Sequence, residues 1–318
     1  MCFSDRINSS ITQSKSIIVA GFDPILANIP KYVSNLCSSE PTDELHIFRS
    51  LNLFYEAALE ALNGSVAAVK PNIAFFEQYG VGGIRAFQWV CASAKERGLP
   101  VIVDAKRGDI GTTAEAYRNA YFKGGPVGTG FVDADALTVS PFLGFDTLTP
   151  FLTACAEHQK GIFVLVRTSN PGAAEFQGLT LHKRDDDISG VVARWVNSKS
   201  EFAMGRNGLS GIGAVVGATT GEDARRMRHL MPNSLFLIPG MGAQGGSAED
   251  ALQSFLKDDN GNISGGIINL SRSLMSNFTR EPTSKEDLIN SLKENATKYN
   301  DEIAKALIKL KAAFTAAV

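Results

Sequence analysis

The sequence has no marked excess of positive or negative charge, and it contains no long apolar run. Its 318 residues include 31 Lys and Arg against 33 Asp and Glu, which gives a formal net charge of −2. This balance argues against a nucleic-acid scaffold, because neutralising phosphates takes a basic face. No apolar run reaches the roughly 20 residues that span a bilayer. The N-terminal segment MCFSDRINSSITQSK also lacks the apolar core of a signal peptide. We therefore expect a globular protein of the cytoplasm.

Cysteine and histidine are scarce and scattered. The four cysteines lie far apart and form no CxxC pair, which is typical of thiols packed as small hydrophobic side chains in a reducing compartment. The four histidines show neither an HExxH motif nor another paired-ligand spacing. The sequence therefore predicts no transition-metal site.

Short apolar, β-branched segments recur along the whole chain. They cover residues 16–22, 66–70, 100–103, 136–139, 161–166, 212–216, 235–238 and 266–270. Continuous apolar runs of this length suit strands that are buried on both faces, as in a parallel sheet covered by helices.

The segments between these runs carry helix signals. Residues 42–63 and 82–98 are amphipathic and stop at glycine. Residues 221–231 begin with acidic and end with basic side chains, which complements the helix dipole. Thr283 and Glu286 have the spacing of a capping box and open a last amphipathic segment.

Eight strands alternating with helices predict an α/β protein with a parallel sheet. Eight strands close a (β/α)₈ TIM barrel, whereas a doubly wound sheet of about six would leave two unused. We expect one barrel domain over residues 1–318. The irregular, charged stretch 178–211 is interpreted as an insertion after the fifth strand, and 284–318 as a C-terminal helical segment.

Polar residues follow most of the predicted strands. In a closed parallel barrel these carboxyl ends meet at one mouth, where barrel enzymes carry out chemistry. The residues that stand there are Asp23, Lys70, Asn72, Asp104, Lys106, Asp109, Ser169, Gln244 and Arg272. The glycine-rich stretch 239–246 and the Ser271-Arg272 pair fit a phosphate cradle after strands seven and eight. The alternative is a flexible turn with a surface arginine.

The sharpest motif is Asp104-x-Lys106-x-x-Asp109. If the strand pleat continues, Asp104 and Lys106 point to the same side, towards the mouth. Charges so close perturb each other's ionisation. The alternative is a solvated salt-bridge cluster on a loop, but Lys70 on the neighbouring strand would complete a Lys–Asp–Lys–Asp array.

At these residues the sequence resembles the orotidine 5′-monophosphate decarboxylases, over nearly the whole chain. The matching motifs are GFDP at 21–24, KPN at 70–72, DAKRGDI at 104–110, TSNPG at 168–172, PGMGAQGG at 239–246, and Arg272. The resemblance implies decarboxylation of orotidine 5′-monophosphate to UMP and CO₂ in de novo pyrimidine biosynthesis, on a TIM barrel and without a cofactor.

The resemblance also implies roles for the matching residues. Lys106 would protonate C6 of the pyrimidine, Asp104 would lie against the substrate carboxylate, and Lys70 would link Asp104 to a ribose hydroxyl. The other expected substrate contacts are Asp23 and Asn72 near the ribose, Ser169 on the pyrimidine, Pro239 as a pocket wall, and Gln244 and Arg272 on the phosphate.

Asp109, Ile110 and Thr113 are expected to reach into the active site of a second subunit, which makes the protein a homodimer with shared sites. One departure from the family pattern is Ser271, which stands before the phosphate arginine where glycine is usual.

Two alternative functions remain open: a sugar-phosphate barrel that uses a metal-stabilised enediolate, and a non-catalytic nucleotide-binding barrel. Lys70 argues against the first, because it stands where an acidic metal ligand should be.

Overall fold

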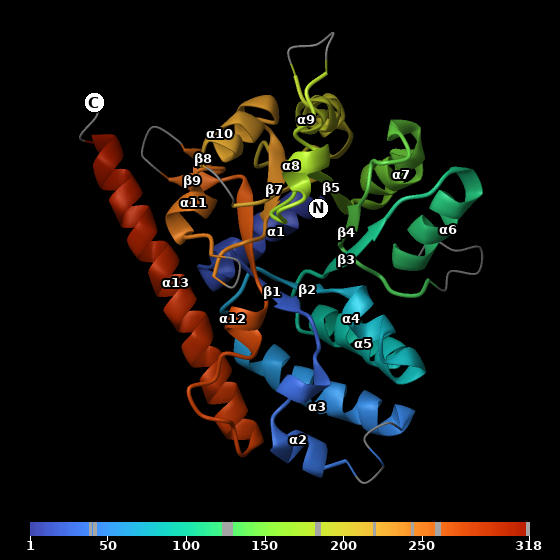
Figure 1. Cartoon of the computed structure of the whole chain (residues 1–318), viewed down its shortest axis with the longest axis vertical. Helices are drawn as coiled ribbons and strands as arrows, with labels where there is room; N and C mark the ends of the chain where they lie inside the picture. The colour runs from blue at the N-terminus through green and yellow to red at the C-terminus, as the bar shows by residue number, and fades with distance from the viewer. Residues whose placement is uncertain are drawn as a thin grey trace.

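The computed structural model describes residues 1–37, 40, 43–122, 130–181, 186–218, 221–242, 245–257 and 262–315. Its centre is an eight-stranded parallel sheet in the order β2-β1-β10-β7-β6-β5-β4-β3. The outermost strands β2 and β3 meet through the bridges Val69–Val101 and Asn72–Asp104, which close the sheet. The predicted single-domain (β/α)₈ barrel is therefore confirmed (Figure 1).

The eight barrel strands coincide with the eight apolar runs of the sequence. They are β1 Ile18–Phe22, β2 Ala68–Pro71, β3 Ile102–Arg107, β4 Ala136–Val139, β5 Gly161–Arg167, β6 Ser210–Val216, β7 Ser234–Ile238 and β10 Gly266–Leu270. A small antiparallel hairpin, β8 Leu256–Lys257 and β9 Ile263–Ser264, precedes the last of them.

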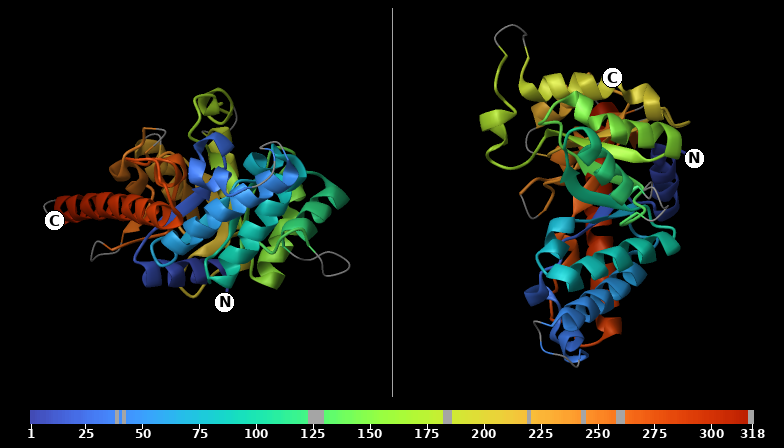
Figure 2. Two further views of the ribbon diagram at one scale, coloured as in Figure 1. Left: turned by 90° about the horizontal axis from the view of Figure 1, so that it is seen from below. Right: turned by 90° about the vertical axis from the view of Figure 1, so that its right-hand side faces the viewer.

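Helices surround the barrel (Figure 1). The longer ones are α3 Glu44–Leu62, α5 Gly80–Glu96, α6 Gly111–Tyr121, α7 Thr149–His158, α9 Ile188–Ser198, α10 Gly221–Leu230 and α13 Lys285–Thr315. The shorter ones are α2 Lys31–Asn35, α4 Ile73–Glu77, α8 Ala173–Phe176, α11 Ala248–Leu252 and α12 Arg272–Met275, with 3₁₀ turns at Leu26–Asn28, Phe145–Leu148 and Ser200–Ala203. The long helix α13 runs along one flank of the barrel (Figure 2). None of the helices in the described ranges could span a membrane.

The N-terminal helix α1, Phe3–Ser14, closes the amino end of the barrel. Phe3 and Ile7 are buried in the inner core with side chains from the barrel strands. Gly161 is required there, because a Cβ at this position would lie 2.1 Å from the Phe3 ring. With this end plugged, the carboxyl-end mouth is the open one.

The stretch 178–211 is not an insertion along its whole length. Helix α9 lies within it and packs against β5 and β6, so it is the outer helix of the fifth βα unit. Asp187 caps this helix by accepting the N–H of Gly190 at 2.7 Å. The predicted insertion therefore contains an ordinary barrel helix. Its residues 182–185 lie outside the described ranges.

The predicted start of the last helix is wrong by one residue. Helix α13 begins at Lys285, and the Ser284 hydroxyl accepts the N–H of Asp287 at 3.1 Å. The Asp287 carboxylate in turn accepts from the Thr283 hydroxyl at 2.7 Å. Ser284 is thus the residue that caps the helix, instead of Thr283. Asp287, instead of Glu286, is the residue that reaches back, and it bonds to Thr283.

Candidate active site

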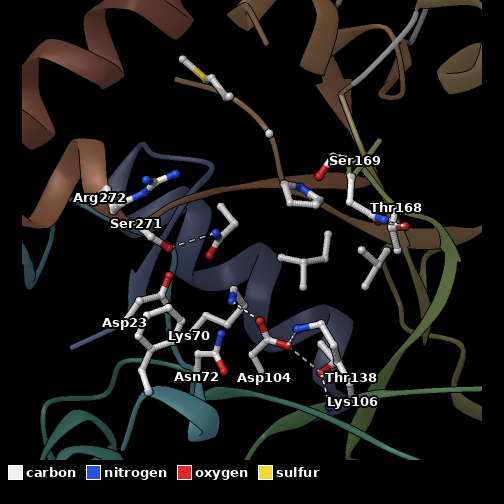
Figure 3. Close-up of a pocket in the computed structure, with 18 of the residues that line it drawn as sticks. Asp23, Lys70, Asn72, Asp104, Lys106, Thr138, Thr168, Ser169, Ser271 and Arg272 are labelled. Atoms are coloured by element: carbon white, nitrogen blue, oxygen red, sulfur yellow. Dashed lines mark hydrogen bonds and ion pairs between the residues drawn. The ribbon is translucent and has the colours of Figure 1, made fainter. Parts of the chain in front are cut away.

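A cavity of about 490 Å³ opens at the carboxyl-end mouth of the barrel. Its lining includes most of the site residues predicted from the sequence: Asp23, Lys70, Asn72, Asp104, Lys106, Ser169, Pro239 and Arg272 (Figure 3). Gln244 lies outside the described residues. Asp109, Ile110 and Thr113 are absent from the described lining of this cavity.

Two lysines hold the two oxygens of one carboxylate at the floor of the cavity. Lys70 Nζ lies 2.5 Å from Asp104 Oδ2, and Lys106 Nζ lies 2.5 Å from Asp104 Oδ1. The Lys70 and Asp104 side chains are only 6% and 10% exposed, whereas that of Lys106 is 50% exposed. Lys106 is therefore the more accessible of the two lysines to a molecule in the cavity.

The array shifts the ionisation of its buried members. Burial alone would raise the pKa of Asp104, but the charges of Lys70 and Lys106 outweigh burial and hold that pKa well below its usual range. Burial would lower the pKa of Lys70, but Asp104 and Asp23 outweigh it and raise the pKa. Asp104 is consequently a fixed negative charge and Lys70 a fixed positive charge inside the barrel.

The backbone at Lys106 is not regular strand. Lys106 has φ +49°, and the register between β3 and β4 shifts between Val103 and Arg107. Asp104 and Lys106 do reach the same cavity, as predicted, but through this irregularity instead of a simple pleat. A left-handed conformation is uncommon for a lysine and needs support from its surroundings.

Thr138, in the middle of β4, supplies that support and was missed in the sequence analysis. Its hydroxyl oxygen accepts the N–H groups of Ala105 at 3.0 Å and Lys106 at 2.9 Å. Its hydroxyl proton goes to Asp104 Oδ1 at 2.9 Å. The signal was a single polar residue within an apolar strand, ALTV.

Several polar atoms on the β1 and β10 side of the cavity have no protein partner among the described residues. They are Asp23 Oδ1, Asn269 Oδ1 and Ser273 Oγ, all buried. Buried polar atoms of this kind normally bond to protein, water or ligand. This side of the cavity is therefore suited to a polar ligand such as a sugar. Asn269 and Ser273 were not predicted, although Asn269 also interrupts an apolar strand.

The opposite wall presents apolar side chains. It includes Leu165, Val215, Leu237, Pro239 and Met241. Thr168, Ser169 and Asn170, at the end of β5, border this wall with polar groups. An apolar wall edged by hydrogen-bonding groups is suited to a flat heterocyclic ring.

Arg272 lies at the mouth with the glycine-rich loop that follows β7. It is exposed, and none of the ion pairs among the described residues involves it. Gly240 and Gly242 have φ +110° and +79°, which only glycine adopts readily. A free guanidinium beside a tight glycine loop is suited to an anionic group.

Asp109 and Ile110 lie in the loop between β3 and α6, and Thr113 lies in the first turn of α6. Asp109 Oδ1 accepts the N–H of Ile110 at 2.8 Å, and Ile110 is 63% exposed. Further exposed apolar side chains are Phe142 and Leu143 in the loop after β4 and Phe176 at the end of α8, and we call Ile110, Phe142, Leu143 and Phe176 the rim patch. The rings of Phe142 and Phe176 are 5.6 Å apart. Exposed apolar side chains that pack together are typical of contact surfaces.

The side chains of the described ranges offer no group of three or more His, Cys, Asp or Glu that could hold a metal ion.

Barrel and cavity together define a (β/α)₈ protein with a Lys–Asp–Lys array at the floor of its cavity. The walls around this array are suited to a sugar, a flat ring and an anion. The sequence model of the orotidine 5′-phosphate decarboxylase / HUMPS family matches residues 50–309. The chain belongs to this family.

Individual members of the family match this chain over most of their length. The orotidine 5′-phosphate decarboxylase of Caldicellulosiruptor saccharolyticus is 40% identical over 277 residues, which cover 86% of this chain and 89% of that protein. That of Clostridium kluyveri is 33% identical over 301 residues, covering 95% and 97%. The solved structure of Leishmania donovani OMP decarboxylase is 29% identical, with a TM-score of 0.70, and the match covers 97% of this chain and all of that one.

Proposed function

We propose that this chain converts orotidine 5′-monophosphate to UMP and CO₂ in de novo pyrimidine biosynthesis, with Lys106 as the proton donor. The observation that carries the proposal is the Lys70–Asp104–Lys106 array, in which only Lys106 is half exposed to the cavity. Relatives named orotidine 5′-phosphate decarboxylase support the choice of substrate.

The reaction breaks the bond between C6 and the carboxylate carbon. CO₂ leaves, the electron pair stays on C6, and Lys106 Nζ delivers a proton to that carbon. A well-placed general acid contributes about 10²–10⁴-fold, or roughly 3–5 kcal/mol. Removing CO₂ without an electron sink is much harder than that. The remainder comes from charges fixed in place before the reaction and from binding of the remote phosphate and ribose.

We assign each of the other cavity residues a role that matches the part of the cavity in which it lies. Asp23, with its unpartnered buried oxygen, and Asn72 lie on the ribose side. Ser169 contacts the pyrimidine, Pro239 walls it, and Arg272 binds the phosphate together with Gln244. In the proposed mechanism Asp104 lies against the substrate carboxylate, and Lys70 links Asp104 to the ribose.

The proposed assembly is a homodimer with shared active sites. Asp109 and Ile110, in the loop before α6, and Thr113, in the first turn of α6, are not among the lining residues of the cavity of their own chain, and Ile110 belongs to the exposed rim patch. Burying this patch against a second copy would place the three residues beside the partner's cavity. The four cysteines are free, which fits the proposed cytoplasmic location.

The test is the loss of ultraviolet absorbance when orotidine 5′-monophosphate is added to the purified chain. Lys106→Ala should abolish this loss while leaving measurable UMP binding, because phosphate and ribose contacts lie elsewhere in the cavity. Turnover of the variant within tenfold of the wild-type rate would remove Lys106 as the proton donor. No turnover by the wild-type chain would overturn the proposed function.

A further inference from the structure

The geometry points to Gln177 as a positioning residue for substrate recognition: we propose that its side-chain amide holds the pyrimidine-contacting segment 168–170 in place. Gln177 follows α8, directly before the segment interpreted as an insertion. The inference rests on the proposed function, and it assigns a role to a residue outside the lining of the cavity.

Both polar atoms of the Gln177 amide bond to the same residue of the cavity wall. The Thr168 N–H donates to Gln177 Oε1 at 2.9 Å, and Gln177 Nε2 donates to Thr168 Oγ1 at 2.8 Å. This pairing fixes the amide in one orientation, because a backbone N–H can only donate.

The fixed orientation sets the direction of the next bond. Since Thr168 Oγ1 accepts from Gln177, its own proton is free to donate to Asn170 Oδ1, at 2.6 Å. Thr168 and Asn170 both line the cavity, on either side of Ser169. One glutamine therefore orders the two residues that flank the proposed pyrimidine contact.

Gln177 is itself anchored to the barrel's outer layer. Its carbonyl oxygen accepts both the N–H and the hydroxyl of Ser189, each at 3.0 Å. Ser189 is fully buried in α9. The rigid helix of the fifth βα unit is thus connected through Gln177 to the cavity wall.

Ser169 is also supported on its other side. A Cβ on Gly217, directly after β6, would lie 2.9 Å from Ser169 Cβ. Ser169 therefore packs against the backbone of Gly217, while Gln177 bonds to the neighbouring Thr168. Segment 168–170 has little freedom to move, which is what recognition of a flat ring by hydrogen bonds requires.

The test compares a ligand that has the base with one that lacks it. Gln177→Ala should weaken UMP binding by roughly tenfold, because two hydrogen bonds that order the segment are lost. Binding of ribose 5-phosphate should stay within about twofold, because its proposed contacts belong to or follow β1, β2, β7 and β10 and not β5. Gln177→Glu should fall between Ala and wild type, because its carboxylate still accepts the Thr168 N–H but does not donate to the hydroxyl.

Glu175→Gln is the matched control, since Glu175 is exposed on the same short helix. It should bind both ligands as the wild-type chain does. Thermal unfolding of each variant separates positioning from loss of the fold.

Equal weakening of UMP and ribose 5-phosphate by Gln177→Ala would overturn the inference, and so would unchanged UMP binding. Either result, with a wild-type chain that decarboxylates its substrate, leaves the proposed function intact. A wild-type chain without decarboxylase activity would overturn the proposed function and this inference together.

Discussion

The Ser271 hydroxyl occupies the space that a side chain on Gly21 would need. A Cβ built on Gly21 would lie 2.0 Å from Ser271 Oγ and 3.0 Å from Ser271 Cβ. Ser271 Oγ also accepts from the Asn269 amide at 3.4 Å. The serine before the proposed phosphate arginine is therefore directed towards β1, and a glycine on β1 makes room for it.

This pairing predicts a compensating pair of substitutions. Gly21→Ala should lower kcat/KM at least tenfold, because the new methyl group must push away the residue that precedes Arg272. Adding Ser271→Gly should restore most of the loss, since the obstructing side chain is then gone. Steady-state kinetics of the two single variants and the double variant test the coupling. Simple additivity of the two effects would show that the residues act independently.

The Thr138 hydroxyl gives a second prediction. Thr138→Val keeps the shape of the side chain but leaves Asp104 Oδ1 and the N–H groups of Ala105 and Lys106 each one hydrogen bond short. The free energy of unfolding should fall by about 1–3 kcal/mol, and kcat should fall by about tenfold or more because Lys106 loses its support.

Thr138→Ser should recover most of the activity, because it retains the hydroxyl. A valine variant with wild-type kcat would mean that the left-handed turn at Lys106 does not depend on Thr138.

The barrel could be predicted from the sequence because each strand is a continuous apolar run that is buried on both faces. The charged floor was predictable because Lys70, Asp104 and Lys106 end or closely follow the apolar runs 66–70 and 100–103. Thr138 and Asn269 were missed because the sequence does not distinguish a polar residue that serves a site from one that is simply packed within a buried strand. What they contact depends on the pairing of strands far apart in the chain.

Gln177 was missed for a related reason. Its partners are Thr168 on one side and Ser189 on the other, and a turn brings them together. No periodicity in the irregular segment indicates that turn. The shared-site roles of Asp109, Ile110 and Thr113 stay predictions.

A third prediction concerns pH and an ion-pair cluster at the amino end of the barrel. Asp133 bonds to Lys160 at 2.6 Å and to Lys95 at 2.7 Å. Burial would raise the pKa of Asp133, but the hydrogen bonds and charges of the two lysines outweigh burial and lower the pKa to about 2. Because the folded-state pKa lies below the unfolded value of about 3.9, the carboxylate stabilises the fold above about pH 4. That contribution is lost as pH falls towards 2.

Urea unfolding of the wild-type chain and of Asp133→Asn measures this contribution. The difference in unfolding free energy should be largest near neutral pH and should shrink as pH falls from about 4 towards 2. A difference that stays constant over this range would show that the ion pairs do not stabilise the fold.

A fourth prediction is that EDTA leaves decarboxylation unchanged. Lys70 stands on β2 where a metal-dependent relative would need an acidic ligand, and a cation beside its ammonium group would be repelled. The rate of absorbance loss with and without EDTA tests this. Loss of activity that Mg²⁺ restores would instead favour the metal-stabilised enediolate mechanism.

The last prediction concerns sharing of the active site between subunits. Two inactive variants, Lys106→Ala and Asp109→Ala, are mixed under conditions that exchange subunits. If Asp109 serves the partner's cavity, one site of a mixed dimer carries both lesions and the other carries none. Random pairing makes about half of the dimers mixed, so activity should recover to roughly a quarter of the wild-type value, by site counting for a two-fold interface.

The control mixes each variant with itself, which should give no recovery. If Lys106 and Asp109 served the same chain's cavity, every site in a mixed dimer would retain one lesion, and exchange would restore nothing. Mass spectrometry of differently tagged chains establishes that exchange has occurred. Proven exchange without regained activity would therefore exclude the shared site, while Lys70, Asp104 and Lys106 would still form the catalytic array within one chain.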